Sequence, residues 1–350
     1  MVNGTGKIIG RMPASSFSFT MSTGIVSISA LIHGEGQVSA VLLLIGITAL
    51  LTIGSLYTLK IALMPVTFKN EFLDHKAFLG FFTVSAGLDV ISTRLMLSYP
   101  RPDDYMFFLV SVGFLLLFSF ILLAKLYRGH LHFDRDTVTS EWLNIPVAIE
   151  ASAISMSIYF QSTGHPDAFE FIFILGLVLA GFMTYAAVNL IEAVNLFSPG
   201  TRREFSGMFF VNMGAGAILS LASLELLMVL APASTTLIQE ILKVLFVSGG
   251  IYSTIWLPIV VSKYFSSLKK LRKLRYRVSQ WAIIFPLGMY SVTTHYLSEY
   301  FHFYGFFNTI SYAVFVVALT AWVLETAIMS VALAADLRKA RNKGKMENLG

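Results

Sequence analysis

The stretch WAIIFPLGMYSVTTHYL, residues 281–297, is mostly apolar over nearly the length of a membrane-spanning helix and contains one proline, Pro286. A helix needs about 20 mostly apolar residues to cross the hydrocarbon core of a bilayer. The stretch follows a basic run from Lys269 to Arg277, whereas the next gap, 300–305, has no Lys or Arg. Short loops rich in Lys and Arg stay in the cytoplasm, so this helix is predicted to enter the membrane from the cytoplasmic side.

The same charge asymmetry repeats along the whole chain. All of the 25 Lys and Arg residues except Arg94, Arg101 and Lys243 lie in the N-terminal arm, the C-terminal tail or every second gap between apolar segments. This alternation predicts a multi-pass protein of the cell membrane with both termini in the cytoplasm. The ten predicted spans lie near 14–32, 37–63, 77–98, 105–127, 142–161, 168–197, 206–230, 235–265, 278–299 and 306–337.

The composition agrees with an integral membrane protein. Of the 350 residues, 56% are hydrophobic and 13% are charged, against roughly 25% charged in soluble domains. Ten spans use most of the length, so residues 1–350 are predicted to form a single transmembrane domain without a cleavable signal peptide. The absence of Cys excludes disulfides and thiolate metal sites. We interpret the basic run 269–277 as a topology signal beside anionic lipid headgroups, not as a nucleic-acid site.

The spans pair into five helical hairpins, at about 14–63, 77–127, 142–197, 206–265 and 278–337. Transporters often contain internal repeats packed around a central path. The predicted fold class is therefore an all-α membrane protein, with ten transmembrane helices arranged as five hairpins in a quasi-fivefold ring around a pore. The first helix of each hairpin is richer in Gly, Ser and Thr, which favours it for the inner ring. Tight helix packing alone is the alternative explanation for these small residues.

One layer of residues recurs in the first helices of the hairpins. Its members lie about 8–11 residues into each helix and share one depth at a rise of about 1.5 Å per residue. They are Gly24, Gly87, Glu150, Gly214 with Gly216, and Phe285. The glycines would leave a gap that the phenyl ring fills, an arrangement typical of a hydrophobic gate. Pro286 is expected to kink its helix and so to present Phe285 differently from its neighbours.

Four motifs together resemble the tellurite-resistance/dicarboxylate transporter family, also called the voltage-dependent anion channel family. They are residues 281–297, STGIVSI at 22–28 with Thr23, AGLDVISTRL at 86–95 and MGAGAI at 213–218. This family includes malic-acid transporters, TehA-like proteins and plant slow anion channels. The resemblance covers essentially the whole chain. It implies a five-hairpin ring with one pore per subunit, commonly in a homotrimer, and a pore occluded by the Phe before the Pro, here Phe285.

Ionisable residues inside spans are costly and are therefore candidates for function. Arg94 near the outer end of its span would attract anions, or is an interfacial or ion-paired arginine. Asp89 lies about 140° around the helix from Arg94, so its partner is expected on another helix. Glu150 is a candidate proton-coupling site, or a neutral carboxyl hydrogen-bonded between helices. His295 would add positive charge to the outer vestibule, or is satisfied by packing and hydrogen bonds.

Other charged residues have structural explanations. Glu192, Glu225 and Glu325 are expected to link helices, and Lys243 to pair with Glu240 three residues before it. No cofactor is expected, and the chain has no Walker A, HExxH or GxSxG motif.

The predicted function is a channel or permease for small anions in the lipid bilayer. Its substrates would be C4-dicarboxylates such as malate, or inorganic oxyanions and halides such as tellurite or chloride. The first alternative is a proton-coupled dicarboxylate transporter or efflux protein that uses Glu150. An intramembrane enzyme or sensor is the second, although the sequence offers no constellation of catalytic groups at a recognisable spacing. The identity of the anion and the direction of its flux are not encoded in any motif of the chain.

Overall fold

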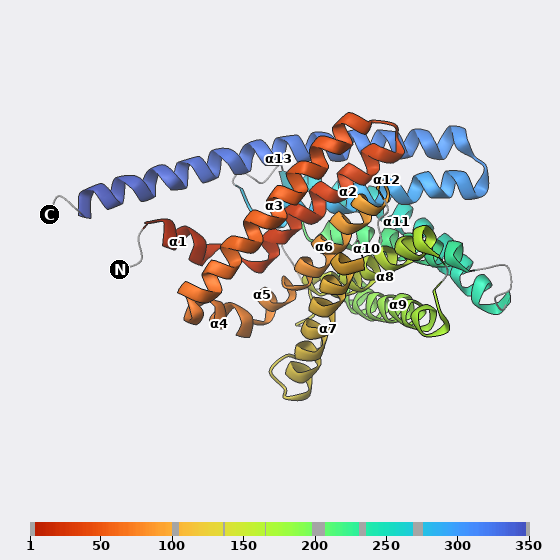
Figure 1. The fold of residues 1–350 in the computed structure, drawn as a ribbon, viewed down its shortest axis with the longest axis horizontal. Helices are drawn as coiled ribbons and strands as arrows, with labels where there is room; N and C mark the ends of the chain where they lie inside the picture. Colours follow the sequence, from red (N-terminus) through yellow and green to blue (C-terminus); the bar gives the residue numbers. More distant parts are fainter. Residues whose placement is uncertain are drawn as a thin grey trace.

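The computed structural model describes residues 4–99, 105–135, 137–164, 166–197, 207–230, 236–268 and 276–347. Every secondary-structure element within these ranges is helical (Figure 1). Arg101, Arg202, Arg203 and most of the basic run that begins at Lys269 lie outside the described residues.

The long helices alternate between buried and exposed members along the chain. In order they are α2 (Ser18–Ile32), α3 (Gly36–Leu63), α6 (Phe82–Met96), α7 (Tyr105–Tyr127), α8 (Asn144–Thr163), α9 (Ala168–Phe197), α10 (Phe209–Val229), α11 (Thr236–Leu268), α12 (Trp281–Phe301) and α13 (Tyr304–Glu347). Short helices precede or connect them: α1 (Gly4–Arg11), η1 (Ala14–Phe17), α4 (Pro65–Leu73), α5 (His75–Leu79), η3 (Ser140–Leu143) and η4 (Val278–Gln280).

Nine helical segments of the described chain are long and apolar enough to cross a membrane. They match nine of the predicted spans to within a few residues, which confirms a multi-pass membrane protein. The remaining predicted span corresponds to α12, which continues as one helix through Pro286. Its polar residues Ser291, Thr293, Thr294 and His295 make α12 less apolar than the other long helices, so a count of ten spans stays a prediction.

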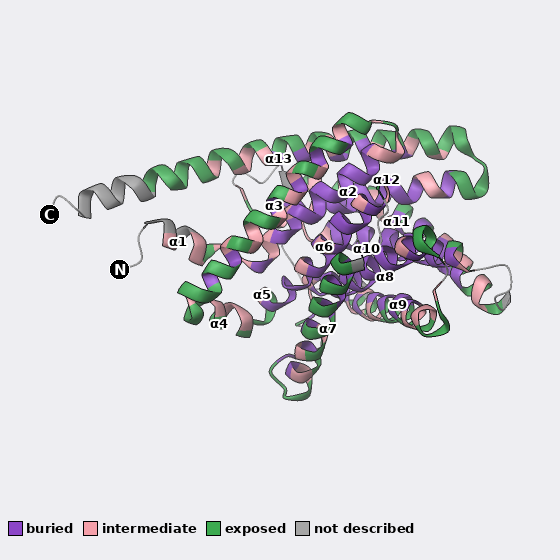
Figure 2. Cartoon of the chain, viewed as in Figure 1, coloured by how far each residue is buried: buried purple, intermediate pink, exposed green. Residues whose placement is uncertain are grey.

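Burial separates the long helices into two sets (Figure 2). We compare an apolar window of 18 residues in each segment. In the segments containing α2, α6, α8 and α10, between 72% and 94% of that window is buried, against 22% to 33% for α3, α7, α9, α11 and α13. Most of α12 is also buried. The first helix of each predicted hairpin is thus the inner one, as the distribution of small residues indicated. The exposed set presents apolar side chains outward, as expected for helices that face lipid.

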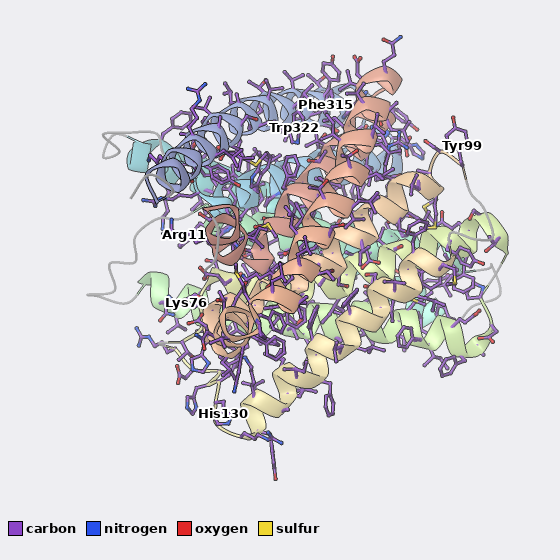
Figure 3. All side chains as sticks on the ribbon, turned by 60° about the vertical axis from the view of Figure 1, so that its left-hand side comes forward. Arg11, Lys76, Tyr99, His130, Phe315 and Trp322 are labelled. Carbon is purple, nitrogen blue, oxygen red and sulfur yellow. The ribbon has the colours of Figure 1, made fainter. Side chains whose placement is uncertain are left out.

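The inner helices contact one another in chain order. The packed pairs are α2 with α6, α6 with α8, α8 with α10, α10 with α12, and α12 with α2. Each inner helix also packs against the exposed helix that follows it. Arg11, Lys76 and His130 lie toward one end of the molecule and Tyr99 toward the other (Figure 3).

The connection between α3 and α6 contains helix α4, which was not predicted from the sequence. Pro65 begins this helix, where its missing amide hydrogen costs no hydrogen bond. Lys60 from the end of α3 is buried and forms an ion pair with Glu71 of α4. Lys60 Nζ also donates to the Met12 carbonyl at 2.6 Å, and the Ala14 amide donates to Glu71 Oε1 at 2.6 Å. The pair therefore fixes the chain where it enters η1 and α2.

Candidate functional site

The five inner helices enclose an inner cavity at their N-terminal ends, with a volume of about 240 Å³. Its lining mixes polar side chains with apolar residues such as Met21, Met208 and Phe285. The hydroxyl, amide and charged residues are Ser15, Ser18, Thr83, Asn144, Ser279, Lys76 and Glu141. These residues come from the starts of the inner helices or from the short helices before them, because each inner helix begins at this end. Unpaired amides at helix N-termini give such a cavity a partial positive potential.

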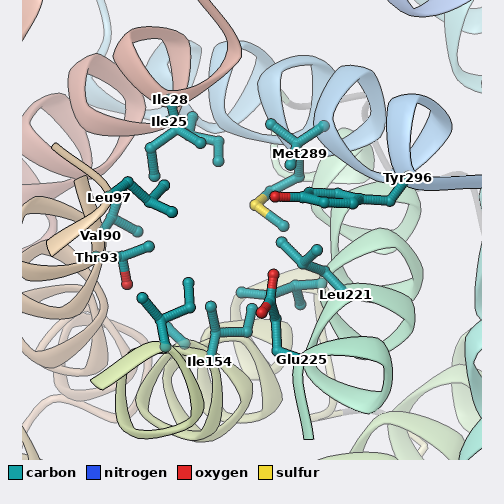
Figure 4. Close-up of a pocket in the computed structure, with 14 residues that line it drawn as sticks. Ile25, Ile28, Val90, Thr93, Leu97, Ile154, Leu221, Glu225, Met289 and Tyr296 are labelled. Atoms are coloured by element: carbon teal, nitrogen blue, oxygen red, sulfur yellow. The ribbon is translucent and has the colours of Figure 1, made fainter. Parts of the chain in front are cut away.

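A second, outer cavity lies among the C-terminal halves of the same helices and has a volume of only about 30 Å³. Side chains from all five helices point into it (Figure 4). Its lining is mostly aliphatic: Ile25, Ile28, Val90, Leu97, Ala151, Ile154, Ile158, Ile218, Leu221, Met289 and Val292. The polar side chains are Thr93, Glu225 and Tyr296. One water needs about 10–15 Å³ of such space, so an anion with its hydration shell does not fit.

The two cavities are lined by one stripe on each inner helix. On α12 the stripe is Ala282 and Phe285 in the inner cavity, then Met289, Val292 and Tyr296 in the outer one. Steps of three and four residues place side chains on the same helical face. Similar steps occur on the other inner helices.

Phe285 is the last α12 residue that lines the inner cavity, and its side chain is fully buried. The outer cavity begins with Met289, one turn further along α12. Along α12, Phe285 therefore lies between the inner cavity, which it lines, and the outer cavity.

The family model for voltage-dependent anion channels, SLAC1, matches residues 11–330. The chain belongs to the voltage-dependent anion channel family. The match confirms the resemblance found from the sequence motifs, and it covers every inner helix. Membership in the voltage-dependent anion channel family assigns the chain to anion channels and transporters and not to a family of enzymes. A comparison with curated proteins finds no match.

In this member of the voltage-dependent anion channel family, the predicted glycine positions lie at contacts between helices. A Cβ atom on Gly24 would lie 2.7 Å from Val90 Cγ1 of α6, and one on Gly214 would lie 2.8 Å from Pro286 Cβ of α12. A Cβ on Gly87 would approach the Phe17 carbonyl at 3.5 Å, and one on Gly216 would lie 2.8 Å from Ser253 Oγ. None of the four glycines lines either cavity. They allow the close approach of helices that shapes the cavities.

Arg94 is buried and points away from the outer cavity toward α2 and α3. Its Nε donates to Ser27 Oγ at 3.0 Å and to Ser39 Oγ at 2.9 Å, and its Nη1 donates to Ser98 Oγ at 2.5 Å. Within the described residues, no carboxylate lies within ion-pair distance of Arg94. Its neighbour Thr93 is the residue of this turn that lines the outer cavity.

The intramembrane carboxylates occupy different surroundings. Asp89 Oδ2 accepts from Ser152 Oγ of α8 at 2.6 Å, which confirms a partner on another helix. Glu150 is buried against α9, where a Cβ on Gly181 would overlap its carboxyl group at 2.1 Å. Neither carboxyl oxygen of Glu150 has a hydrogen-bond partner in the described part of the chain. Glu150 is also absent from the lining of both cavities.

Several other predicted interactions are present. Lys243 Nζ lies 2.8 Å from Glu240 Oε1, which confirms the predicted ion pair. Glu192 links two elements, since it accepts from Ser140 Oγ at 2.7 Å and from Asn212 Nδ2 at 3.0 Å.

Two further site residues have polar partners on neighbouring elements. His295 Nδ1 lies 3.2 Å from Asn308 Oδ1, and its Nε2 lies 3.6 Å from Glu299 Oε1. Thr23 Oγ1 accepts from Trp322 Nε1 of α13 at 2.9 Å.

Glu225 is the residue whose position the sequence reasoning missed. It does link helices, because Gln161 Nε2 of α8 donates to Glu225 Oε2 at 2.7 Å. It is also part of the lining of the outer cavity. Its signal in the sequence was its place on the stripe, seven residues after Ile218 and four after Leu221. The described residues contain no group of three His, Cys, Asp or Glu side chains placed to hold a metal ion.

Proposed function

We propose that this protein is a channel or permease for small anions, with a pathway that runs along the axis of the inner helices. The observation that carries the proposal is the pair of cavities, lined by the same stripes and separated at Phe285. The proposed architecture is a quasi-fivefold ring of five hairpins with ten spans. The pathway passes from the inner cavity, past the phenyl ring, into the outer cavity.

The inner cavity supplies the chemistry that attracts an anion. Hydroxyl and amide groups donate hydrogen bonds, and the helix N-termini add partial positive charges. The lining also holds one formal charge of each sign, on Lys76 and Glu141. Such hydrogen-bond donors bind anions without matching the shape of one particular anion, so carboxylates, inorganic oxyanions and halides all fit the proposal. C4-dicarboxylates such as malate are the larger substrates proposed, and chloride or tellurite the smaller ones.

The outer half of the pathway supplies the barrier. A narrow aliphatic cavity excludes ions because an ion must shed its hydration shell to enter. In the proposed mechanism, Phe285 and the narrow outer cavity together block the pathway, and movement of the phenyl ring opens it. The basic loops support an orientation in which the inner cavity and both termini face the cytoplasm, and the proposed location is the plasma membrane. A homotrimer with one pathway per subunit is the proposed assembly.

The proton-coupled carrier that uses Glu150 is the weaker alternative. Its motivation was a carboxyl at mid-membrane depth. The side chain of Glu150 packs against Gly181 of α9 and borders neither cavity, so a proton on it has no direct contact with a passing anion.

The deciding experiment is Phe285→Ala in purified protein reconstituted in planar bilayers. Removal of the ring joins the two cavities, and we expect chloride and nitrate conductance to rise at least about tenfold, equivalent to ~1.4 kcal/mol of barrier. Phe246→Ala is the matched control, because Phe246 is equally buried but lines neither cavity. Equal conductance of Phe285→Ala and wild type, with both proteins monodisperse, would refute the gate.

A further inference from the structure

Among the described residues, Glu225 is the only one with a carboxyl group that lines the outer cavity. Its carboxyl and the hydroxyl of Tyr296 both point toward the cavity interior (Figure 4). The side chain is 3% exposed, so any contact that it makes with an ion occurs inside the pathway. In a cavity of about 30 Å³, an anion would lie close to every lining side chain, Glu225 included.

The described surroundings of Glu225 do not neutralise a negative charge. Gln161 Nε2 donates to Glu225 Oε2 at 2.7 Å and to the Glu225 backbone carbonyl at 3.0 Å. This amide holds the carboxyl in place but carries no charge. Within the described residues, no Lys, Arg or His lies within 4.0 Å of its carboxyl oxygens. The rest of the lining is aliphatic apart from Thr93 and Tyr296.

The other ionisable groups on the elements packed against α10 lie away from the outer cavity. On α8, α9 and η3 these are Glu150, Tyr159, Glu170, Tyr185, Glu192 and Glu141; on α11 and α12 they are Glu240, Lys243, Tyr252, Lys263, Tyr264, Tyr290, His295, Glu299 and Tyr300. None of them lines this cavity, whereas Tyr296 does. The charge of the outer cavity is therefore set by Glu225, since an unperturbed tyrosine is neutral up to about pH 10.

We propose that Glu225 is the charge gate of the outer half of the pathway, open to anions when its carboxyl is protonated and closed when it is ionised. This inference rests on the proposed anion pathway. An ionised carboxylate repels an anion strongly at contact distance in apolar surroundings, because little solvent screens the two charges. The protonated form instead offers a hydrogen-bond donor, as Tyr296 does. Proton concentration would then control anion flux.

The test uses Phe285→Ala as the background, so that Phe285 no longer limits conduction. Chloride current is recorded in planar bilayers between about pH 5 and 8.5, a range in which carboxyl groups of buried sites titrate. We expect the current of Phe285→Ala to fall at least about tenfold as the pH rises, because a poorly screened like-charge contact is worth more than the ~1.4 kcal/mol that a tenfold change represents. Adding Glu225→Gln, which keeps the shape and the amide contact, should hold the current at its low-pH value throughout. Adding Glu225→Asp should retain the pH dependence.

Glu150→Gln in the same background is the matched control, because this carboxyl is equally buried but borders neither cavity. It should leave the pH profile unchanged. A current from Phe285→Ala that has the same pH profile with and without Glu225→Gln, at high pH as well as at low pH, would overturn the charge gate and leave the pathway intact. A Phe285→Ala protein without added current would instead overturn the proposed pathway and the charge gate with it. If Glu225→Gln fails to yield monodisperse protein, loss of the pH dependence in Glu225→Asp overturns the charge gate as well.

Discussion

The inner and outer cavities are lined by the same five helices but differ in size and chemistry. The inner one is about 240 Å³ and lined by hydroxyls, an amide and two charged side chains among apolar residues, whereas the outer one is about 30 Å³ and mostly aliphatic. The difference arises from the residue types along one stripe and not from a change of fold. On α2, for example, Ser18 lines the inner cavity and Ile25 and Ile28 line the outer one.

In the proposed pathway, this comparison assigns attraction and exclusion of the ion to different halves of the same helices. Polar groups at the helix N-termini would stabilise an anion before it loses its water. Close packing further along the helices would then create the barrier. Three substitutions test how the two halves differ in stability, packing and solvation. They lie in the inner half, at the boundary between the halves and at the outer end.

The largest effect is expected at the entrance to the inner half, for Lys60→Met. The substitution leaves Glu71 buried without its cation, which typically costs about 3–5 kcal/mol. The free energy of unfolding in detergent should fall by this amount. Hydrogen exchange in the segment from Met12 to Ser18 should rise, because the pair holds the Met12 carbonyl and the Ala14 amide.

Lys243→Met provides the control, since Lys243 and Glu240 form an exposed pair. Exposed pairs contribute little to stability because solvent screens the two charges. Equal losses for the two lysines would show that the inner end does not depend on the Lys60–Glu71 contact.

A smaller effect is expected at the boundary between the halves, for Gly214→Ala. The new methyl group would lie 2.8 Å from Cβ and Cγ of Pro286 and 2.9 Å from its Cα, so α10 and α12 must move apart. Overpacking of this kind costs about 1–3 kcal/mol. Because Phe285 precedes Pro286, the conductance should change together with the stability.

Gly176→Ala is the matched control for this change. A Cβ on Gly176 meets no atom within 4 Å, and alanine is favoured over glycine in a helix by about 0.8–1 kcal/mol. The control should therefore be neutral or stabilising in the same unfolding assay. A Gly214→Ala protein that behaves like the control would mean that the contact between α10 and Pro286 is loose.

The sequence predicted the helices well and the orientation of side chains poorly. Charge alternation and apolar length located the spans, because both are set by the bilayer and not by tertiary contacts. Depth along a helix predicted one shared layer for Glu150 and Phe285, but depth does not define the face of the helix on which a side chain lies. Glu150 points to Gly181 of α9, whereas Glu225 points into the outer cavity. The face depends on which neighbours pack against the helix, and that information lies in residues distant in the chain.

The smallest effect is expected at the outer end, where His33 follows α2. Burial, and then the nearby His295, lower the pKa of His33 from 6.5 to about 4. The folded protein therefore keeps His33 neutral as the pH falls, while the unfolded chain binds a proton below about pH 6.5. Stability should decline between about pH 6.5 and 4 and be independent of this residue above that window. Because the ring is only half-buried, solvent screening should limit the decline to less than about 1 kcal/mol.

His33→Gln should flatten the pH profile of unfolding in this window. The amide can replace the ring nitrogen that lies 2.9 Å from Ser311 Oγ, so the packing at neutral pH should change little. His130→Gln, in the exposed loop after α7, is the control and should leave the profile as it is in the wild type. Identical profiles for wild type and His33→Gln would show that the outer end is as solvated as the inner one. The contrast between the two halves would then apply only to the cavities and not to the ends of the helices.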